Sequence, residues 1–249
     1  MVATSVVGII QARMSSQRLP GKVLLPLVGD MPLLEVLYVR LRPADVVWWI
    51  ATTEREVDDP IVELGQRLGL PVFRGSEDNV LLRFSELLDL TNPSWFIRVT
   101  ADNPFSSGAL VQALVDEITS IPRQIDRIWA KHPESGYPLG FVPEVVRSSA
   151  IRRLASLPEI VGSHHAEHVT SAIDQFASHS VSVGNQMQKP EWRWTIDTEK
   201  DLHMARKAFG LFGPNWAQIE YSEMVEILTA NPEIPAINQS ERQAEHDAR

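Results

Sequence analysis

The sequence predicts an α/β protein with a mostly parallel sheet that is covered by helices on both faces. Short apolar runs alternate with segments of helical period over roughly the first half of the chain, which is the pattern of such sheets. The composition, with 44% hydrophobic and 22% charged residues, is that of an ordinary globular protein. A chain of 249 residues is long enough to bury a full core in one domain. We therefore expect a single domain over residues 1–235.

The expected elements follow from the period of the apolar residues. Short runs rich in Val, Ile, Trp and Phe predict strands, and apolar residues that recur with the helical period predict helices. Strands are expected at 6–10, 46–51, 71–73, 95–100, 180–183 and 192–196. Helices are expected at 33–41, 61–68, 80–90, 109–118, 199–212 and 221–230. The less regular stretch 121–147 is expected to form strands or an arm that projects from the sheet, and the polar stretch 236–249 a frayed tail.

The charge balance and the missing cysteines exclude several classes of function. The chain has 23 basic and 32 acidic side chains, a net charge of −9, so we expect no nucleic-acid partner and no anionic membrane surface as a partner. The absence of cysteine excludes disulfides, thiolate catalysis and cysteine-ligated zinc. No signal-peptide pattern and no long apolar segment is found, and we expect a cytoplasmic protein.

The loop that follows the first expected strand is the most informative segment. Residues 11–22 read QARMSSQRLPGK and place Arg13, Arg18 and Lys22 among small residues. Arginine can form forked, charge-assisted hydrogen bonds with phosphate, and lysine adds a point charge. The loop matches neither a Walker A motif nor a dinucleotide-binding glycine pattern. It is interpreted either as a polyphosphate cradle or as a solvated basic loop.

Two aspartates at the ends of expected strands are candidate metal ligands. Asp102 lies at the end of the run 95–100, and Asp197 follows the run 192–196. Mg²⁺ usually takes one or two protein carboxylates and completes its shell with substrate oxygens and waters. The local alternatives are a turn residue at Asp102 and a side chain that complements a helix dipole at Asp197.

A histidine group in the second half of the chain has three interpretations. His164 and His168 lie one turn apart on an expected helix, as metal-binding pairs can, but no third ligand and no HExxH motif accompany them. The alternatives are contact with a substrate through Glu167 or His168, and packing.

Several segments occur in the order found in one enzyme family. They are IIQARMSSQRLPGKVL at 9–24, ATT at 51–53, FRGSEDNVL at 73–81, RVTADNP at 98–104, EHVT at 167–170 and WTIDTEKDL at 194–202. This order resembles the cytidylyltransferases that make CMP-activated sugar acids, the acylneuraminate and 3-deoxy-manno-octulosonate type. Within them, the branch labelled spore coat polysaccharide biosynthesis protein F-like is the most similar.

The resemblance implies a three-layer α/β/α nucleotide-diphospho-sugar transferase fold of the Rossmann-like kind, and a homodimer. It implies that Arg13, Lys22, Asp102 and Asp197 are catalytic, with Asp102 and Asp197 as ligands of Mg²⁺. The implied nucleotide-binding residues are Gln11, Ala12, Arg13, Arg18, Lys22, Arg74, Ser76, Asn79 and Arg98. The implied acceptor-binding residues are Tyr137, Glu144, Glu167 and His168, in part on a dimerisation arm at 121–147.

The function that the resemblance implies is transfer of CMP from CTP to a sugar acid or related acidic acceptor, with release of pyrophosphate, in the synthesis of a cell-surface polysaccharide or natural product. Asp197 and His168 are the candidates for a general base. Ser15 replaces a glycine of the family pattern, and Leu139 and Pro143 replace two acidic residues. Because of these departures, two alternatives stay open: a nucleotide-sugar-dependent glycosyltransferase, and a nucleotide-binding paralogue with lost or altered catalysis.

Overall fold

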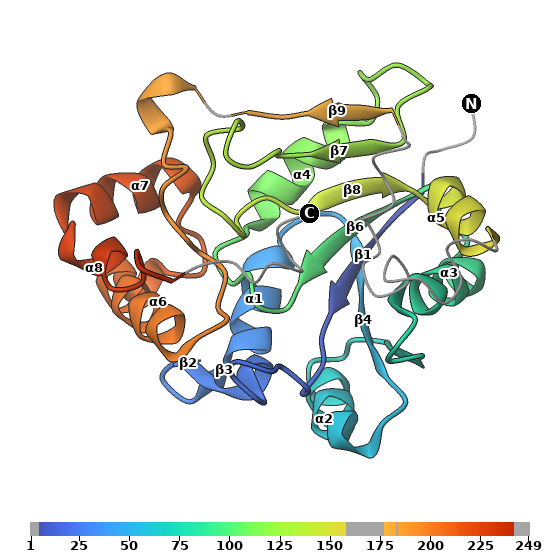
Figure 1. Cartoon of the computed structure of the whole chain (residues 1–249), viewed down its shortest axis with the longest axis horizontal. Coiled ribbons are helices and arrows are strands. Elements are labelled where there is room, and N and C mark those ends of the chain that lie inside the picture. Colours follow the sequence, from blue (N-terminus) through green and yellow to red (C-terminus); the bar gives the residue numbers. More distant parts are fainter. Residues whose placement is uncertain (1–4, 158–176, 183, 242–249) are drawn as a thin grey trace.

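Seven strands form one mixed sheet at the centre of the molecule, in the order β5-β4-β1-β6-β8-β7-β9 (Figure 1). The computed structural model describes residues 5–157, 177–182 and 184–241. β1 (Val6–Gln11) is parallel to β4 (Val47–Thr53) and to β6 (Trp95–Thr100), and β4 is parallel to β5 (Val72–Gly75). β8 (Glu144–Arg147) is antiparallel to β6 and to β7 (Arg127–Trp129), and β9 (Ser178–Ser180) is parallel to β7.

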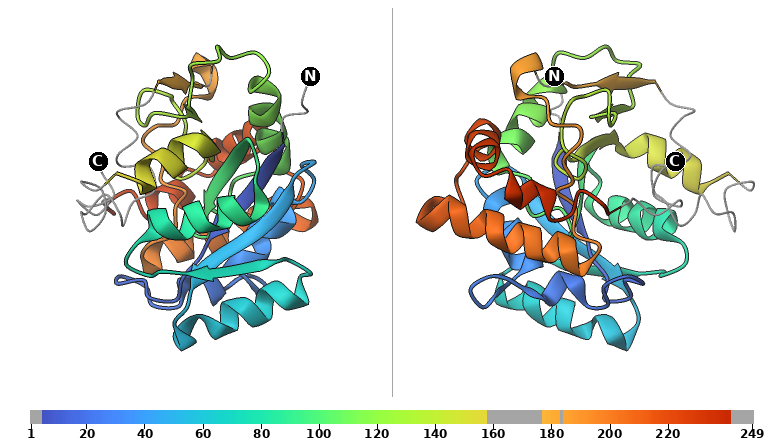
Figure 2. Two further views of the ribbon diagram at one scale, coloured as in Figure 1. Left: turned by 90° about the vertical axis from the view of Figure 1, so that its right-hand side faces the viewer. Right: turned by 60° about the vertical axis from the view of Figure 1, so that its left-hand side comes forward.

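Helices flank the sheet on both sides, as the two further views show (Figure 2). The α-helices are α1 (Leu33–Leu41), α2 (Asp59–Arg67), α3 (Val80–Thr91), α4 (Gly108–Glu117), α5 (Ser148–Ala155), α6 (Glu199–Phe212), α7 (Tyr221–Ala230) and α8 (Glu233–Ala236). Four short 3₁₀ helices are described, at Lys22–Leu24, Glu56–Asp58, Asn185–Met187 and Gly213–Asn215, and a small hairpin pairs β2 (Pro26–Val28) with β3 (Met31–Pro32). None of the helices in these ranges is long and apolar enough to cross a membrane.

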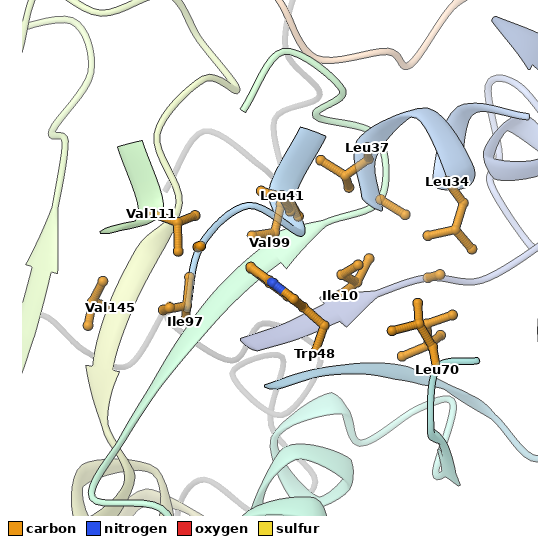
Figure 3. Close-up of a cluster of buried hydrophobic side chains, with 14 of the residues drawn as sticks. Ile10, Leu34, Leu37, Leu41, Trp48, Leu70, Ile97, Val99, Val111 and Val145 are labelled. Atoms are coloured by element: carbon orange, nitrogen blue, oxygen red, sulfur yellow. The ribbon is translucent and has the colours of Figure 1, made fainter. Parts of the chain in front are cut away.

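The alternation of side chains along the strands creates a separate core on each face of the sheet. In β1, Ile10 packs with residues of α1, α2 and α4, and part of this cluster is drawn in Figure 3. Its neighbour Ile9 points to the opposite face and packs with residues of α3 and α5. Both isoleucines are fully buried. The result is three layers, helices on either side of one sheet, and the α/β fold class predicted from the sequence is confirmed.

A third core cluster joins α6 and α7 to the edge of this sandwich. Trp194 lies at its centre, fully buried, and stacks on Phe105 with a ring-centroid distance of 4.8 Å. Arg40 of α1 is buried beside this cluster, where its guanidinium donates to four backbone carbonyls, those of Phe105, Ser106, Trp216 and Ile219. Burial lowers the pKa of Arg40 to about 10. Arg40 thus fixes the segment after β6 to the segment before α7.

The periodic segments were predicted closely, and the irregular ones were not. α6 and α7 coincide with the helices expected at 199–212 and 221–230. The segment 192–196 is not a strand. Apolar and polar residues alternate in this segment because Trp194 and Ile196 are buried in the third cluster. The segment pairs with another part of the described chain only through an isolated bridge between Leu139 and Arg193. β9 ends at 180, where the expected strand began.

Two further expectations concern the middle and the end of the chain. Of the outcomes expected for 121–147, the structure shows strands, because β7 and β8 extend the main sheet and the chain between them packs along its edge (Figure 1). Of the stretch 236–249, which was expected to fray, the structure describes residues 236–241. Asn238 is buried and its side chain donates to the Arg193 carbonyl oxygen at 3.0 Å.

Candidate functional site

The loop after β1 lies at the carboxyl end of the parallel strands, where ligands of open α/β sheets bind. Backbone hydrogen bonds assemble this edge: the Ala12 amide donates to the Ala51 carbonyl at 3.1 Å, and the Ala101 amide to the Gln11 carbonyl at 2.9 Å. The Ile196 amide donates to the Asp102 carbonyl at 2.9 Å. Segments that are far apart in the chain therefore meet here.

Lys22 lies between the two candidate metal ligands. Its Nζ donates to Asp102 Oδ2 at 2.6 Å, to Asp197 Oδ1 at 2.8 Å and to the Ile196 carbonyl at 2.8 Å. Gly21, at φ +70°, provides the left-handed turn that begins the 3₁₀ helix carrying Lys22. Burial would lower the pKa of Lys22, but the charges of the two aspartates outweigh burial and raise this pKa. Burial would likewise raise the pKa of Asp102, which the Lys22 charge instead lowers.

Asp197 is surrounded by cations. Arg193 donates a short hydrogen bond to Asp197 Oδ2, and Arg18 Nη2 lies 3.1 Å from the same oxygen. Arg193 also pairs with Asp201 at 3.1 Å. These contacts join three carboxylates, those of Asp102, Asp197 and Asp201, to three cations. The cluster is therefore electrically balanced without any ligand.

The site fits a metal ion whose coordination shell is completed by oxygen atoms of the substrate. Asp102 Oδ1 is buried and has no hydrogen-bond partner in the part of the chain that the structure describes, and such an atom is suited to bind a cation. In the same ranges, no group of three or more histidine and acidic side chains converges on one point. Mg²⁺ is usually bound by one or two protein carboxylates, with substrate oxygens and waters as the other ligands, and the pair Asp102 and Asp197 fits this pattern.

Ser15, the residue that departs from the family's glycine, fixes the loop to its surroundings. Its hydroxyl donates to Glu77 Oε1 at 2.8 Å, and Glu77 also accepts from Arg55 Nη1 at 2.7 Å. The Met14 amide donates to Asp58 Oδ1 at 2.7 Å, while Arg13 of the same loop is exposed. The extra side chain at position 15 is therefore accommodated, and the loop is held by the buried Asp58 and the half-buried Glu77.

Three of the expected nucleotide-binding residues lie away from Asp102 and Asp197: Arg74 in β5, and Ser76 and Asn79 in the turn between β5 and α3. Arg74 pairs with Asp59 at 2.7 Å and donates to the Thr53 carbonyl at 2.9 Å. Asn79 caps α3 by accepting from the Leu82 amide, and the Ser76 hydroxyl accepts from the Asn79 amide at 3.0 Å. These contacts give all three residues a local structural role, and their contact with a nucleotide stays a prediction.

A cavity of about 300 Å³ opens beside the aspartates. It is lined by residues of β6, of the loop between β7 and β8 and of the segment before α6: Arg98, Val99, Thr100, Asp102, Asn103, Trp129, Ala130, His132, Ser135, Tyr137, Pro138, Leu139, Gly140, Val142, Pro143, Glu144, Thr195 and Asp197. Tyr137 and Glu144, expected to bind the acceptor, are among them, as are Leu139 and Pro143. Gly140, at φ +85°, brings the loop so close to Thr195 that an added Cβ would lie 2.7 Å from its Cβ.

Glu144 is fully engaged by two arginines on the cavity wall. Arg98 Nη1 donates to Glu144 Oε2 at 3.0 Å, and Arg127 donates a short hydrogen bond to Oε1. Burial would raise the pKa of Glu144, but these two charges outweigh burial and lower it. Arg98 Nε also donates to Gln11 Oε1 at 3.1 Å. With both carboxylate oxygens bound, Glu144 orients Arg98, which lines the cavity, while Arg127 is buried behind it; the three groups together carry one net positive charge.

The sequence did not reveal Arg127 and Arg193. Arg193 lies within the aromatic run that predicted a strand, and Arg127 begins a short strand in an irregular stretch, so neither has a motif of its own. A single arginine inside an apolar run is the signal that could have suggested a buried ion pair. Glu167, His168 and the neighbouring His164 lie outside the described residues.

Comparison with known proteins shows the family of the chain. A family model described as Cytidylyltransferase matches residues 7–149. The spore coat polysaccharide biosynthesis protein SpsF of Bacillus subtilis is 32% identical over 237 residues, which cover 90% of this chain and 94% of that protein. An uncharacterized protein of Methanocaldococcus jannaschii is 33% identical over 251 residues, 96% of each chain.

Solved structures show the same fold. A cytidylyltransferase from Leptospira borgpetersenii superposes with a TM-score of 0.81 at 26% identity, covering 97% of this chain and 100% of that one. A CMP:2-keto-3-deoxy-manno-octonic acid synthetase, solved with CTP, superposes with a TM-score of 0.60 at 18% identity, covering 83% and 98%. Given a family model that spans more than half of the sequence and relatives that align along nearly all of it, the chain belongs to the cytidylyltransferase family and is a nucleotidyltransferase.

Proposed function

We propose that the protein transfers CMP from CTP to an acidic acceptor, such as a sugar acid, and releases pyrophosphate in a Mg²⁺-dependent reaction. The observation that carries the proposal is the cluster of Lys22, Asp102 and Asp197, in which the two aspartates line a cavity of about 300 Å³. The choice of CTP follows from the family, and a protein of the same fold has been solved in complex with CTP.

The proposed reaction needs positioning and charge neutralisation more than covalent chemistry from the protein. An acceptor oxygen attacks the α-phosphorus of CTP, a new P–O bond forms, and the bond to the β-phosphate oxygen breaks. Pyrophosphate leaves with the electron pair, and the acceptor oxygen loses its proton. Asp102 and Asp197 would hold Mg²⁺, which would supply charge neutralisation at the reacting phosphate. Lys22 and Arg18, which pair with these aspartates in the structure, would neutralise the phosphates of the leaving group.

A net positive group of side chains beside the cavity supports an anionic acceptor. Arg98 lines the cavity, and its charge together with that of the buried Arg127 exceeds the single carboxylate charge of Glu144, so this group would favour a carboxylate or phosphate. SpsF is named for spore coat polysaccharide biosynthesis, and we propose a comparable cell-surface pathway for this protein. The homodimer and the cytoplasmic location stay predictions; light scattering after size-exclusion chromatography tests the former.

The test is a screen for pyrophosphate release with each of the four nucleoside triphosphates, Mg²⁺, and a panel of sugar acids, sugar phosphates and phosphonates. We expect release with CTP and an acidic acceptor, and a loss of about 10²–10³ in rate for Asp102→Asn. Asp89→Asn, which changes an exposed aspartate on α3, is the matched control and should keep full activity. Release of a nucleoside diphosphate from a nucleotide-sugar, or binding of CTP with no turnover across the panel, would contradict the proposal.

A further inference from the structure

A buried group of three polar side chains lies directly behind Asp197. It consists of Arg193, Asp201 and Asn238, which are 7%, 0% and 1% exposed, and we call it the Asp197 support. Arg193 bonds both carboxylates: its Nε donates to Asp201 Oδ1 at 3.1 Å, and its Nη2 donates to Asp197 Oδ2. The planar fork of the guanidinium therefore fixes the two aspartates relative to each other.

Asp201 does more than cap the helix that follows. In a capping box, the third helical residue accepts from the backbone of the N-cap residue, and Asp201 does so with the Thr198 amide at 3.0 Å. The same oxygen also accepts from the Asp197 amide at 3.0 Å. Asp201 thus restrains the backbone of Asp197, while Arg193 restrains its side chain.

Asn238 secures this arrangement from the C-terminal segment. Its Nδ2 donates to Asp201 Oδ1 at 2.8 Å and to the Arg193 carbonyl at 3.0 Å. Asn238 lies 37 positions after Asp201 and 45 positions after Arg193 in the chain. These residues lie beyond the segment 7–149 that the family model matches.

The consequence for Asp197 is that its two oxygens are made different. Oδ2 is held by Arg193 and by Arg18, whereas Oδ1 faces Lys22 and, through it, Asp102. We infer that Arg193, Asp201 and Asn238 are positioning residues, which hold Oδ2 so that Oδ1 is presented to the metal that accompanies the nucleotide. This inference rests on the proposed function, and it assigns to the C-terminal segment a role in metal binding.

The experiment measures CTP binding by isothermal titration calorimetry with and without Mn²⁺. The ratio of the two dissociation constants is the gain in affinity due to the metal, and a merely structural role would not change this ratio. For Asn238→Ala and for Arg193→Lys, which keeps the charge but loses the fork, we expect this gain to fall about 10–100-fold. Binding of CTP without metal should change by less than about threefold, since among the described contacts neither Arg193 nor Asn238 bonds to the loop 11–22.

Leu87→Ala is the control for general loss of stability, because Leu87 is fully buried in the α3 core on the other side of the sheet. It should unfold at lower temperature and keep the gain due to metal. If Asn238→Ala does not fold, Asn238→Ser, which keeps one donor, is measured by the same criterion. A full gain in both Asn238→Ala and Arg193→Lys, with loss in Asp197→Asn, would overturn the inference and leave the proposed function intact. No gain in the wild type would overturn both.

Discussion

Replacing Lys22 by methionine should destabilise the protein and make its stability depend on Mg²⁺. Lys22 is 10% exposed in its side chain and makes three hydrogen bonds of 2.6–2.8 Å, two of them to carboxylates. Removing one partner of a buried ion pair costs about 3–5 kcal/mol, because a charge is left uncompensated. For a chain of this size, that loss corresponds to a fall in the melting temperature of about 6–20 °C.

Magnesium should restore much of this loss in the variant and little in the wild type. In the wild type, the ammonium of Lys22 already lies between Asp102 and Asp197, whereas in Lys22→Met those carboxylates carry excess negative charge. A ligand present at about 100 times its dissociation constant stabilises a protein by about 2.7 kcal/mol. The assay is thermal unfolding with and without Mg²⁺ in the absence of nucleotide.

The control is Lys200→Met, which removes a lysine whose side chain is 57% exposed and pairs with Glu241 on the surface. It should cost less than about 1 kcal/mol and show no response to the metal. Equal shifts with Mg²⁺ in the wild type and in Lys22→Met would refute the reasoning, since they would mean that Lys22 does not occupy the place of the metal.

Three further outcomes follow from contacts described above. Gly140→Ala should reduce the melting temperature and the turnover, because φ is +85° and the new Cβ would lie 2.7 Å from Asn103 Oδ1. The control Gly184→Ala should reduce neither, because its new Cβ would meet no atom of the described residues within 4 Å. Arg40→Met should lower the free energy of unfolding in urea by about 3–5 kcal/mol, because buried carbonyls lose their donor; a loss below about 1 kcal/mol would contradict this. Glu144 has a lowered pKa in the folded state, so its contribution to stability is complete above its ordinary pKa of 4.5 and is lost as the pH falls through the lowered value. Glu144→Gln should therefore be less stable at neutral pH, yet lose less stability than the wild type on acidification from about pH 5 to about pH 3; parallel acid curves would count against the assigned ion pairs.

The parts of the fold that could be predicted are those with a local periodic signal. The strand at β1 and the helices α6 and α7 each bury one face of a regular element, so their apolar residues recur at the spacing of that element. Trp194 and Ile196 also alternate, but in an irregular segment whose partners lie in the loop before β8, and the pattern alone does not distinguish this case from a strand.

For the candidate site, the sequence named several of the residues that lie together, but it did not predict how they are arranged. The position of Asp102 at a strand end gave its location, but the sequence assigned Lys22 to a phosphate, and the structure places it between the aspartates. Arg193 and Asn238 were not predicted. They bond each other across 45 positions of the chain, and such a contact leaves no periodic pattern and no motif in the sequence. Such contacts depend on the tertiary fold.

The long chain separation within the site has a consequence for how the protein is made. Lys22 and Asp197 are 175 positions apart, which at a synthesis rate of about 5–20 residues per second corresponds to roughly 10–35 s. During that interval, the strands β4, β5 and β6 are synthesised after β1, while Lys22 has no Asp197 to bind. Asn238 comes later still. The nascent protein can therefore acquire its central sheet before it can acquire a working site, so incomplete chains that are released early would be folded in part and inactive.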